Sequence, residues 1–184
     1  MMKLFAIALI VLSVSVLSST KVKDRKSLQV VPSVDLSRYT GKWYEIARLP
    51  NRFQENCAGE VMATYSLLEG SQLKVINRCR KPNGEIKEAQ GKARLADKNG
   101  PTSKLEVRFA PSWLSWLPAV WGDYWIIDLA SDYSYSVVGT PDRDYLWILS
   151  RTPQMEEATY KGLIDKAAAA GFSVERMVKT RQAE

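Results

Sequence analysis

Between residues 43 and 151 the sequence is a succession of short segments in which apolar and polar side chains alternate. The cleanest covers residues 105–109, where Leu, Val and Phe alternate with Glu and Arg. Such alternation is typical of β-strands with one buried and one exposed face. Turn signals separate the segments, among them Glu69-Gly70, Pro82-Asn83-Gly84 and Asn99-Gly100-Pro101. A fold made of such strands must leave few sheet edges exposed, because a free edge can pair with a strand of another chain.

The alternation predicts eight strands, over residues 43–49, 61–67, 73–78, 91–95, 105–109, 124–129, 135–139 and 145–149. Sequential antiparallel strands with short links favour an up-and-down barrel, because closure removes both free edges. A sandwich needs longer crossing connections than the spacing allows. After Pro153 the period changes to that of one helix ending near Gly171, followed by a short strand at residues 174–178. We therefore predict an all-β fold: an eight-stranded antiparallel up-and-down β-barrel with one C-terminal helix packed on its outside.

The helix needs an apolar patch on the outer wall of the barrel. On the segment 124–129 the outward positions are apolar, whereas other segments carry polar side chains there. We expect Trp125, Ile127 and Leu129 to form this docking face.

The N-terminus has the features of a secretory signal peptide. Lys3 precedes an apolar run from residue 4 to residue 17, and small residues follow it. The alternative is an uncleaved anchor, because the small residues do not form a clean Ala-x-Ala site. We expect a signal peptide at 1–20, a flexible basic lead-in at 21–34 and one domain at 35–184. No cysteine follows the apolar run to carry a lipid, so the predicted location is the periplasm, peripheral at the outer membrane, or the extracellular space.

Charge and residue counts limit the possible functions. The net charge is +6, but the basic residues are scattered and no nucleic-acid-binding module is present. The chain has no histidine, which excludes Ser-His and Cys-His pairs, and two cysteines alone cannot complete a metal site. An exported chain with only Cys57 and Cys79 favours a disulfide, the alternative being two buried thiols. Hairpin counting places Cys57 about three positions beyond the direct partner of Cys79, so a bulge must absorb the offset.

An eight-stranded barrel is just wide enough to hold one small ligand. Several predicted inward positions are small, including Ala47, Ala63 and Ala93, so large side chains do not fill the interior evenly. This favours a ligand cavity over the alternative, a filled core. The expected ligand-binding residues are Ala47, Tyr65, Asn77, Phe109, Tyr124, Tyr135, Val137, Tyr145 and Trp147.

The segment 111–121, PSWLSWLPAVW, is unusually apolar for a loop. Its large side chains are Trp113, Trp116, Leu117 and Trp121, together with Leu114 and Val120. Tryptophan prefers the boundary between membrane and water. We predict that this segment, the Trp loop, dips into a bilayer or covers the cavity; the alternative is a loop folded back into the core.

Three short regions resemble the signatures of the lipocalin family. They are Gly41 and Trp43 before the first strand, Asp132 and Tyr133 between the sixth and seventh, and Arg151 at the end of the eighth. The stretches GKWYEIARLP, ATYSLLEG, KVINRC, GDYWIIDL and TPDRDYLWILSRTP are similar to bacterial lipocalins, apolipoprotein D and plant temperature-induced lipocalins. The resemblance implies a barrel open at one end, with Trp43 across the closed end and Arg151 stacked over it.

The same resemblance implies a function without catalysis or a cofactor: binding and transport or storage of a small hydrophobic ligand. For the bacterial branch the implied ligand is a fatty acid or lysophospholipid. One alternative is an enzyme acting on a lipid in the same cavity, with Glu45 and Asp128 as the inward carboxylates. Another is a protein-interaction module that uses the barrel rim, for example as a homodimer.

Overall fold

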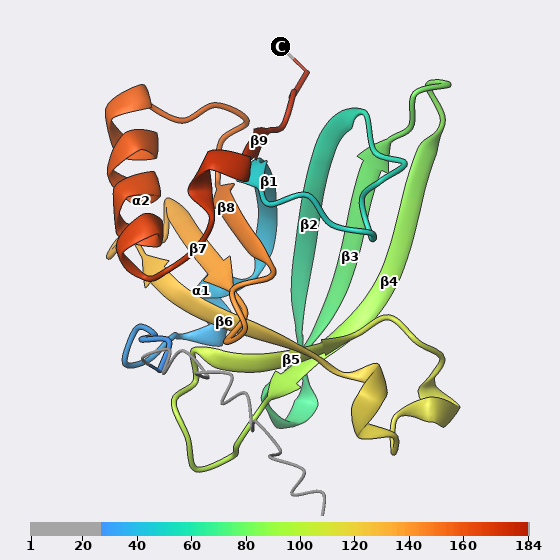
Figure 1. Ribbon diagram of the computed structural model, residues 1–184. Helices are drawn as coiled ribbons and strands as arrows, with labels where there is room; N and C mark the ends of the chain where they lie inside the picture. Colours follow the sequence, from blue (N-terminus) through green and yellow to red (C-terminus); the bar gives the residue numbers. More distant parts are fainter. Residues whose placement is uncertain (1–26, 184) are drawn as a thin grey trace, which may run out of the picture.

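The computed structural model describes residues 27–183, which contain nine β-strands and two α-helices (Figure 1). The strands are β1 (Gly41–Arg48), β2 (Gly59–Leu68), β3 (Gln72–Arg80), β4 (Ile86–Leu95), β5 (Lys104–Arg108), β6 (Gly122–Leu129), β7 (Tyr135–Gly139), β8 (Leu146–Ser150) and β9 (Val178–Lys179). The helices are α1 (Leu36–Tyr39) and α2 (Glu157–Ala169).

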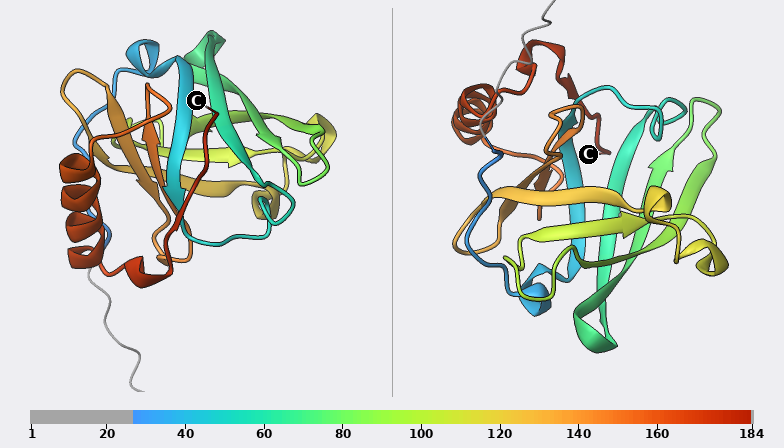
Figure 2. Two further views of the ribbon diagram at one scale, coloured as in Figure 1. Left: turned by 90° about the horizontal axis from the view of Figure 1, so that it is seen from above. Right: turned by 60° about the horizontal axis from the view of Figure 1, so that its bottom comes forward.

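The strands form one antiparallel sheet that closes on itself. Strands β2 to β8 follow one another in order, β1 lies beside β8, and β1 also pairs with β2. The two views in Figure 2 show the resulting closed ring with α2 against its outside. β9 bonds to β1 outside this ring. The predicted up-and-down barrel with one flanking helix and a short final strand is therefore confirmed, and closure leaves neither β1 nor β2 as a free edge.

The C-terminal residues complete the wall between β1 and β2. These two strands pair directly over only four residue pairs, which lie toward the start of β1. Beyond them, the side-chain amide of Gln182 donates to the backbone C=O groups of Glu45 (2.7 Å) and Val61 (3.0 Å). The N–H of Glu60 donates to the C=O of Arg181 at 2.7 Å. Backbone groups that the strand pairing leaves open are thus satisfied by the end of the chain.

Two apolar clusters lie on opposite sides of the barrel wall. The first lies inside the barrel, around the residues at the start of β1, and includes Trp43, Tyr65, Leu73, Leu105 and Ile126. The second lies between the wall and α2 and includes Leu146, Ile148, Leu163, Ala167 and Phe172.

The predicted inward side of β7 is wrong. Tyr135 and Val137, expected in the ligand cavity, belong to the cluster under α2, and Val138 lies in the interior. A Cβ on Gly139 would meet the ring of Phe172, which follows α2, at 2.5 Å. Both faces of β7 are buried, one by the barrel and one by the helix, so the polar alternation that reveals the inner side of other strands is absent.

A bulge in β1 also corrects the prediction for Ala47. The register of β1 against β8 shifts between Glu45 and Ala47. Ala47 is buried, but it pairs with Ile148, which faces α2. The extra residue of a bulge reverses which side chains point inward beyond it.

The docking face for α2 is partly as predicted. Trp125 and Ile127 pack in the cluster under α2, whereas Leu129 packs against the barrel interior. A register shift in β6 between Ile126 and Asp128 explains the change of side. Asp128, expected to point inward, instead accepts a hydrogen bond from Lys166 of α2 at 2.6 Å.

The predicted flexible lead-in, residues 21–34, is packed where the structure describes it. Leu28 is buried under α2, and Val34 is buried in the barrel cluster. The N–H of Val31 donates to the C=O of Ile126 at 3.1 Å. The predicted signal peptide, residues 1–20, lies outside the described residues.

We predict that Trp43→Ala lowers the free energy of unfolding by about 3 to 5 kcal/mol, because it leaves a large hole in a closely packed core. Trp43 is completely buried, whereas Trp113 is 73% exposed. Trp113→Ala is the matched control and should change stability by less than about 0.5 kcal/mol. Urea denaturation followed by circular dichroism measures both, and equal effects would contradict the packing described.

Candidate functional site

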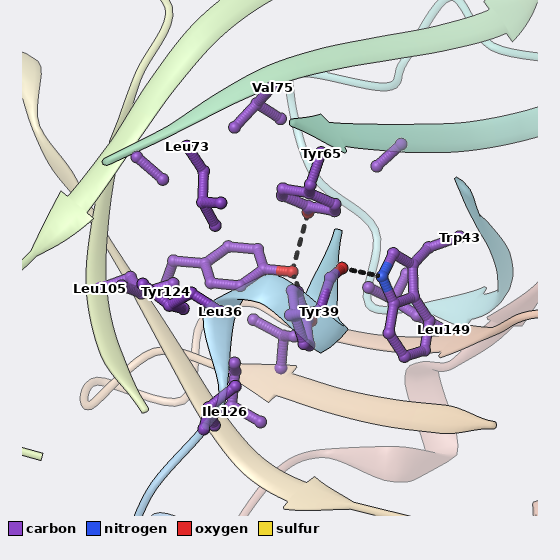
Figure 3. Packing of buried hydrophobic residues seen from close by; sticks show 14 residues of the cluster. Leu36, Tyr39, Trp43, Tyr65, Leu73, Val75, Leu105, Tyr124, Ile126 and Leu149 are labelled. Carbon is purple, nitrogen blue, oxygen red and sulfur yellow. Dashed lines mark hydrogen bonds between the residues drawn. The ribbon is translucent and has the colours of Figure 1, made fainter. Parts of the chain in front are cut away.

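Trp43 closes one end of the barrel. Its indole N–H donates to the C=O of Tyr39 at 2.9 Å, as Figure 3 shows. The guanidinium of Arg151 lies 3.8 Å from the centre of the indole ring. Arg151 also donates to the C=O groups of Thr40 (2.8 Å) and Arg38 (2.7 Å). A guanidinium over a desolvated indole contributes about 2 kcal/mol, and these hydrogen bonds hold it in place.

The other signature residues meet at the same end. Gly41 has a φ of +94°, and a Cβ there would lie 3.3 Å from Nη1 of Arg151. Glycine permits both this backbone conformation and the close approach. The carboxylate of Asp132 accepts the N–H of Ser134 at 3.0 Å, which fixes the turn between β6 and β7. In that turn the C=O of Tyr133 accepts a bond from Arg151 at 3.3 Å.

Above Trp43, three tyrosines share a buried chain of hydroxyl groups, the tyrosine floor. The hydroxyl of Tyr124 lies 2.8 Å from that of Tyr65 and 3.0 Å from that of Tyr39 (Figure 3). The Tyr39 hydroxyl also lies 3.0 Å from Ser136 Oγ. Burial raises the pKa of Tyr39 to about 12 and also raises the pKa values of Tyr65 and Tyr124. Hydrogen bonding among the hydroxyls satisfies polar groups in an apolar interior.

Strands β3 and β4 form the part of the wall that leads from this floor to the open end. Their register runs without a break. Since Val75 lies in the interior cluster, every second pair along the two strands faces inward. From floor to rim these pairs are Leu73 with Ala93, Val75 with Gly91, Asn77 with Ala89, and Cys79 with Lys87. Between the floor and the rim, the inward residues of β4 are therefore all small, namely Ala93, Gly91 and Ala89.

Phe109 shows that this part of the interior is open to solvent. Its ring lies over Gly91, where a Cβ would come within 2.8 Å of it. Phe109 is nevertheless 42% exposed, and the inward-facing Asn77 is exposed as well. At this level the inner face therefore carries an apolar ring and an amide that are both accessible to solvent.

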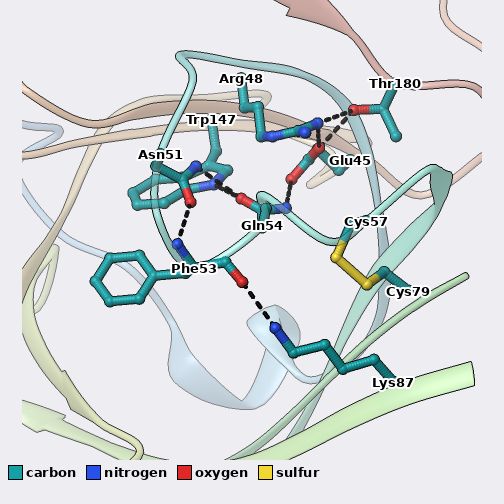
Figure 4. The surroundings of a disulfide bond; sticks show 10 residues. All are labelled: Glu45, Arg48, Asn51, Phe53, Gln54, Cys57, Cys79, Lys87, Trp147 and Thr180. Carbon is teal, nitrogen blue, oxygen red and sulfur yellow. Dashed lines mark hydrogen bonds and ion pairs between the residues drawn. A yellow bond between two sulfur atoms is a disulfide. The ribbon is translucent and has the colours of Figure 1, made fainter. Parts of the chain in front are cut away.

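The loop between β1 and β2 is fastened to the rim on both sides. The disulfide between Cys57 and Cys79 joins the loop to β3, with 5.7 Å between the Cα atoms (Figure 4). From the same loop, Gln54 accepts the indole N–H of Trp147 at 2.9 Å and donates to Glu45 at 2.5 Å. The predicted offset between the two cysteines is absorbed by an irregularity near the start of β2.

Glu45 is a structural carboxylate. Besides Gln54, it accepts bonds from Arg48 at 2.9 Å and from Thr180 at 2.5 Å. Its side chain is 3% exposed, so its charge is compensated by these three donors rather than by water. This arrangement leaves it poorly suited to act as a base on a bound ligand.

Three aromatic rings form a collar at the rim. Tyr145 stacks on Trp147 with 5.7 Å between ring centres, and Phe53 lies 5.6 Å from Tyr145. Phe53 is 53% exposed. The collar gives the mouth of the barrel an apolar lining.

Of the predicted ligand-binding residues, four lie along the open half and two form the floor. Those in the open half are Asn77, Phe109, Tyr145 and Trp147; those in the floor are Tyr65 and Tyr124. Ala47, Tyr135 and Val137 face away from the interior. Sequence reasoning missed Phe53 and Tyr39, which precede or follow a strand and carry no alternation signal. It also missed Ala89 and Lys87, although extending the alternation of β4 back from Gly91 finds both.

The Trp loop lies along the outer wall, on the side of the barrel opposite α2 (Figure 2). The guanidiniums of Arg94 and Arg108 lie 3.9 Å and 5.2 Å from the centre of the Trp121 ring. These arginines belong to the outward positions of β4 and β5. Trp113 and Trp116 are 73% and 75% exposed, and Leu117 is half-buried. In this position the exposed indoles face solvent rather than cover the cavity.

Within residues 27–183, neither helix has the length and apolar character to cross a bilayer.

A closed up-and-down barrel with a sealed floor, an open apolar mouth and one flanking helix defines a class of small ligand-binding β-barrels. A family model described as a lipocalin-like domain matches residues 34–182. The chain belongs to the lipocalin family, whose members bind small hydrophobic ligands.

Individual relatives agree with this assignment. Temperature-induced lipocalin-1 of Arabidopsis thaliana is 41% identical over 88% of this chain and 86% of its own. The outer membrane lipoprotein Blc of Escherichia coli K12 is 36% identical over 85% and 84%, and mouse apolipoprotein D is 34% identical over 84% and 80%. Among solved structures, apocrustacyanin C1 has a TM-score of 0.64 at 18% identity, covering 82% of this chain and 81% of its own.

Because of the tyrosine floor, the free energy of unfolding should decrease at alkaline pH. Burial raises the folded-state pKa of Tyr39 to about 12, above the ordinary tyrosine pKa of 10.0, so the folded protein holds a proton that the unfolded chain releases. The stabilisation is complete below about pH 10 and is lost as the pH rises toward about 12. We predict that urea denaturation shows a falling unfolding free energy over this interval and a smaller fall for Tyr39→Phe. An identical fall in the variant would contradict this account.

Proposed function

We propose that this lipocalin binds and carries or stores a lipid with one acyl chain, a fatty acid or a lysophospholipid, inside its barrel. The observation that carries the proposal is the row of small inward residues on β4, which leaves Asn77 and Phe109 exposed on the inner face. A narrow apolar space open at one end suits a flexible chain with a polar end at the mouth.

We propose that this function involves no catalysis. Support comes from the side chains that line the interior. Glu45 is held by three donors, and the hydroxyls of the tyrosine floor bond to one another. Groups committed in this way stabilise the fold and are poorly placed to transfer protons to a ligand.

We further propose peripheral contact with a membrane through the Trp loop. Trp113 and Trp116 are exposed three residues apart in the sequence, and the guanidiniums of Arg94 and Arg108 lie over the ring of Trp121 in the same loop. Exposed indoles next to basic side chains favour the interface of a bilayer that contains anionic lipids. The relative Blc is by name an outer membrane lipoprotein. Here both cysteines of the chain are joined in the disulfide, so neither is free to carry a lipid.

Export to the periplasm or the extracellular space fits this proposal. The apolar run at residues 4–17 is the proposed targeting signal. The Cys57–Cys79 disulfide adds support, because such bonds persist mainly in oxidising compartments.

The ligand proposal predicts that Ala89→Phe blocks binding. Ala89 faces inward, half-buried, so a phenyl ring there occupies the space of the acyl chain. We expect the affinity for oleic acid, measured by displacement of the neutral dye Nile red, to fall by about tenfold or more. Gln90→Phe places the same ring on the outer face of β4 and should bind as the unaltered protein does.

Lipid extraction and mass spectrometry of the purified protein provide an independent measurement. A co-purifying lipid with one acyl chain supports the proposal. If no lipid co-purifies and neither oleic acid nor lysophosphatidylcholine displaces the dye, the proposed function is wrong.

The membrane proposal predicts that replacing Trp113 and Trp116 by serine weakens binding to vesicles of phosphatidylglycerol and phosphatidylcholine by about tenfold or more, because two indoles no longer enter the interface. Flotation of the vesicles measures binding. Leu67→Ser removes another exposed apolar side chain, 51% exposed and distant in sequence, and should have little effect. Unchanged flotation of the double variant, with its fold and dye binding intact, would exclude the Trp loop as the contact.

A further inference from the structure

The last inward position of β4 carries a positive charge. Lys87 pairs directly with Cys79, and both belong to the unbroken series of inward pairs that begins at the floor with Leu73 and Ala93. Paired residues on antiparallel strands project to the same face of a sheet. The Lys87 side chain therefore lies on the inner face of the barrel at its open end.

Lys87 has a backbone partner and no counter-charge. Its ammonium donates to the C=O of Phe53 at 3.1 Å (Figure 4). Within residues 27–183, no carboxylate lies within ion-pair distance of it. An ammonium has three N–H donors, so two remain available beside the bond to Phe53.

The inner side of the rim also carries an ion pair, whose two charges compensate each other, unlike the charge of Lys87. Arg48 and Glu45 lie 2.9 Å apart and neutralise each other. Because that pair is internally compensated, it provides no net attraction for an anion. Lys87 therefore contributes positive charge to the inner side of the rim that Arg48 does not contribute, and the guanidinium of Arg52 lies nearby, 5.2 Å from the centre of the Phe53 ring.

The surroundings of Lys87 suit the junction between a charged group and an acyl chain. The carbonyl that Lys87 contacts belongs to Phe53, whose exposed ring lies beside Tyr145. Tyr145 in turn stacks on Trp147, so Lys87 stands next to the aromatic collar. One pair further into the barrel, the exposed amide of Asn77 is a second donor on the same face. A cation and an amide at the rim above an apolar interior match an amphiphile that enters tail first.

We propose that Lys87 binds the anionic head group of the ligand, a carboxylate or a phosphate, with Asn77 as an auxiliary donor. This inference rests on the proposed function, since it specifies the class of lipid: singly acylated and anionic rather than neutral. Charge-assisted hydrogen bonds are short and stronger than neutral ones, and at the partly shielded rim they favour the charged ligand over its neutral analogue.

The test compares ligands that share one tail and differ in the head group. Oleic acid, oleoyl lysophosphatidic acid and uncharged oleyl alcohol compete with Nile red for the purified protein, with its disulfide intact and at a pH where the acids are ionised. We expect Lys87→Met to weaken binding of an anionic ligand by about tenfold and to leave the alcohol unchanged. Lys87→Arg keeps the charge and should restore most of the affinity. The loss should shrink at high ionic strength.

Lys92→Met is the matched control. Lys92 lies on the same strand and is exposed on the outer face, so the variant loses the same charge without altering the rim. We expect it to bind all three ligands as the unaltered protein does. If Lys92→Met weakens anionic ligands as much as Lys87→Met, the effect is general electrostatics and the proposed contact is wrong.

The remaining outcomes separate this inference from the proposed function. If the unaltered protein binds the alcohol and the acids, but Lys87→Met changes none of them or all of them equally, the head-group site is wrong and the carrier function stands. If the unaltered protein binds no ligand, both fail. If Lys87→Met loses more affinity for lysophosphatidic acid than for oleic acid, the preferred head group is a phosphate. If it loses more affinity for oleic acid, the preferred head group is a carboxylate.

Discussion

Burial of Trp43 beneath Arg151 is the interaction on which the closed end of the barrel depends. The indole is fully buried, its N–H bonds to the chain just before β1, and Arg151 reaches across from the end of β8. The guanidinium bonds to backbone carbonyls just before the first strand and to the turn before β7. It thereby ties the start of the barrel to its end. Sealing this end leaves the other end as the entrance, whereas the free sheet edges are removed by the pairing of β1 with β2 and β8.

The interior changes character along its length, and that gradient is the physical basis of the proposed function. Large apolar side chains and the bonded hydroxyls of Tyr39, Tyr65 and Tyr124 fill the floor. Small residues on β4 leave the middle open, and aromatic rings with Lys87 surround the mouth. A ligand with an apolar tail and an anionic end has the same gradient. The loop fastened by Cys57 and Cys79 keeps the mouth in a defined shape, because it is covalently bound to β3.

Much of the site could be predicted from the alternation of apolar and polar side chains on strands that have one solvent-exposed face. Errors arose on strands where both faces are buried or where a bulge interrupts the alternation. Asn77 and Phe109 lie on strands whose outer residues are charged, and their inward side was predicted as the structure has it. Tyr135 and Val137 lie on a strand buried on both faces, where no polar residue marks the outside. For Ala47 a bulge in β1 changed the side, and a bulge reflects the shape that neighbouring strands impose.

By itself the sequence determined the number and order of the strands, the flanking helix, the closed-end residues and the family. These properties depend on local periodicity, turn residues and short motifs, all of which are written along the chain. Only the tertiary structure decided which way β7 faces and that the Trp loop lies on the outer wall. It also decided that the C-terminal residues complete the seam between β1 and β2, and that Lys87 stands at the mouth with no carboxylate of residues 27–183 within ion-pair distance. Each of these depends on which distant segments come together, and contacts between distant segments leave no periodic trace in the sequence.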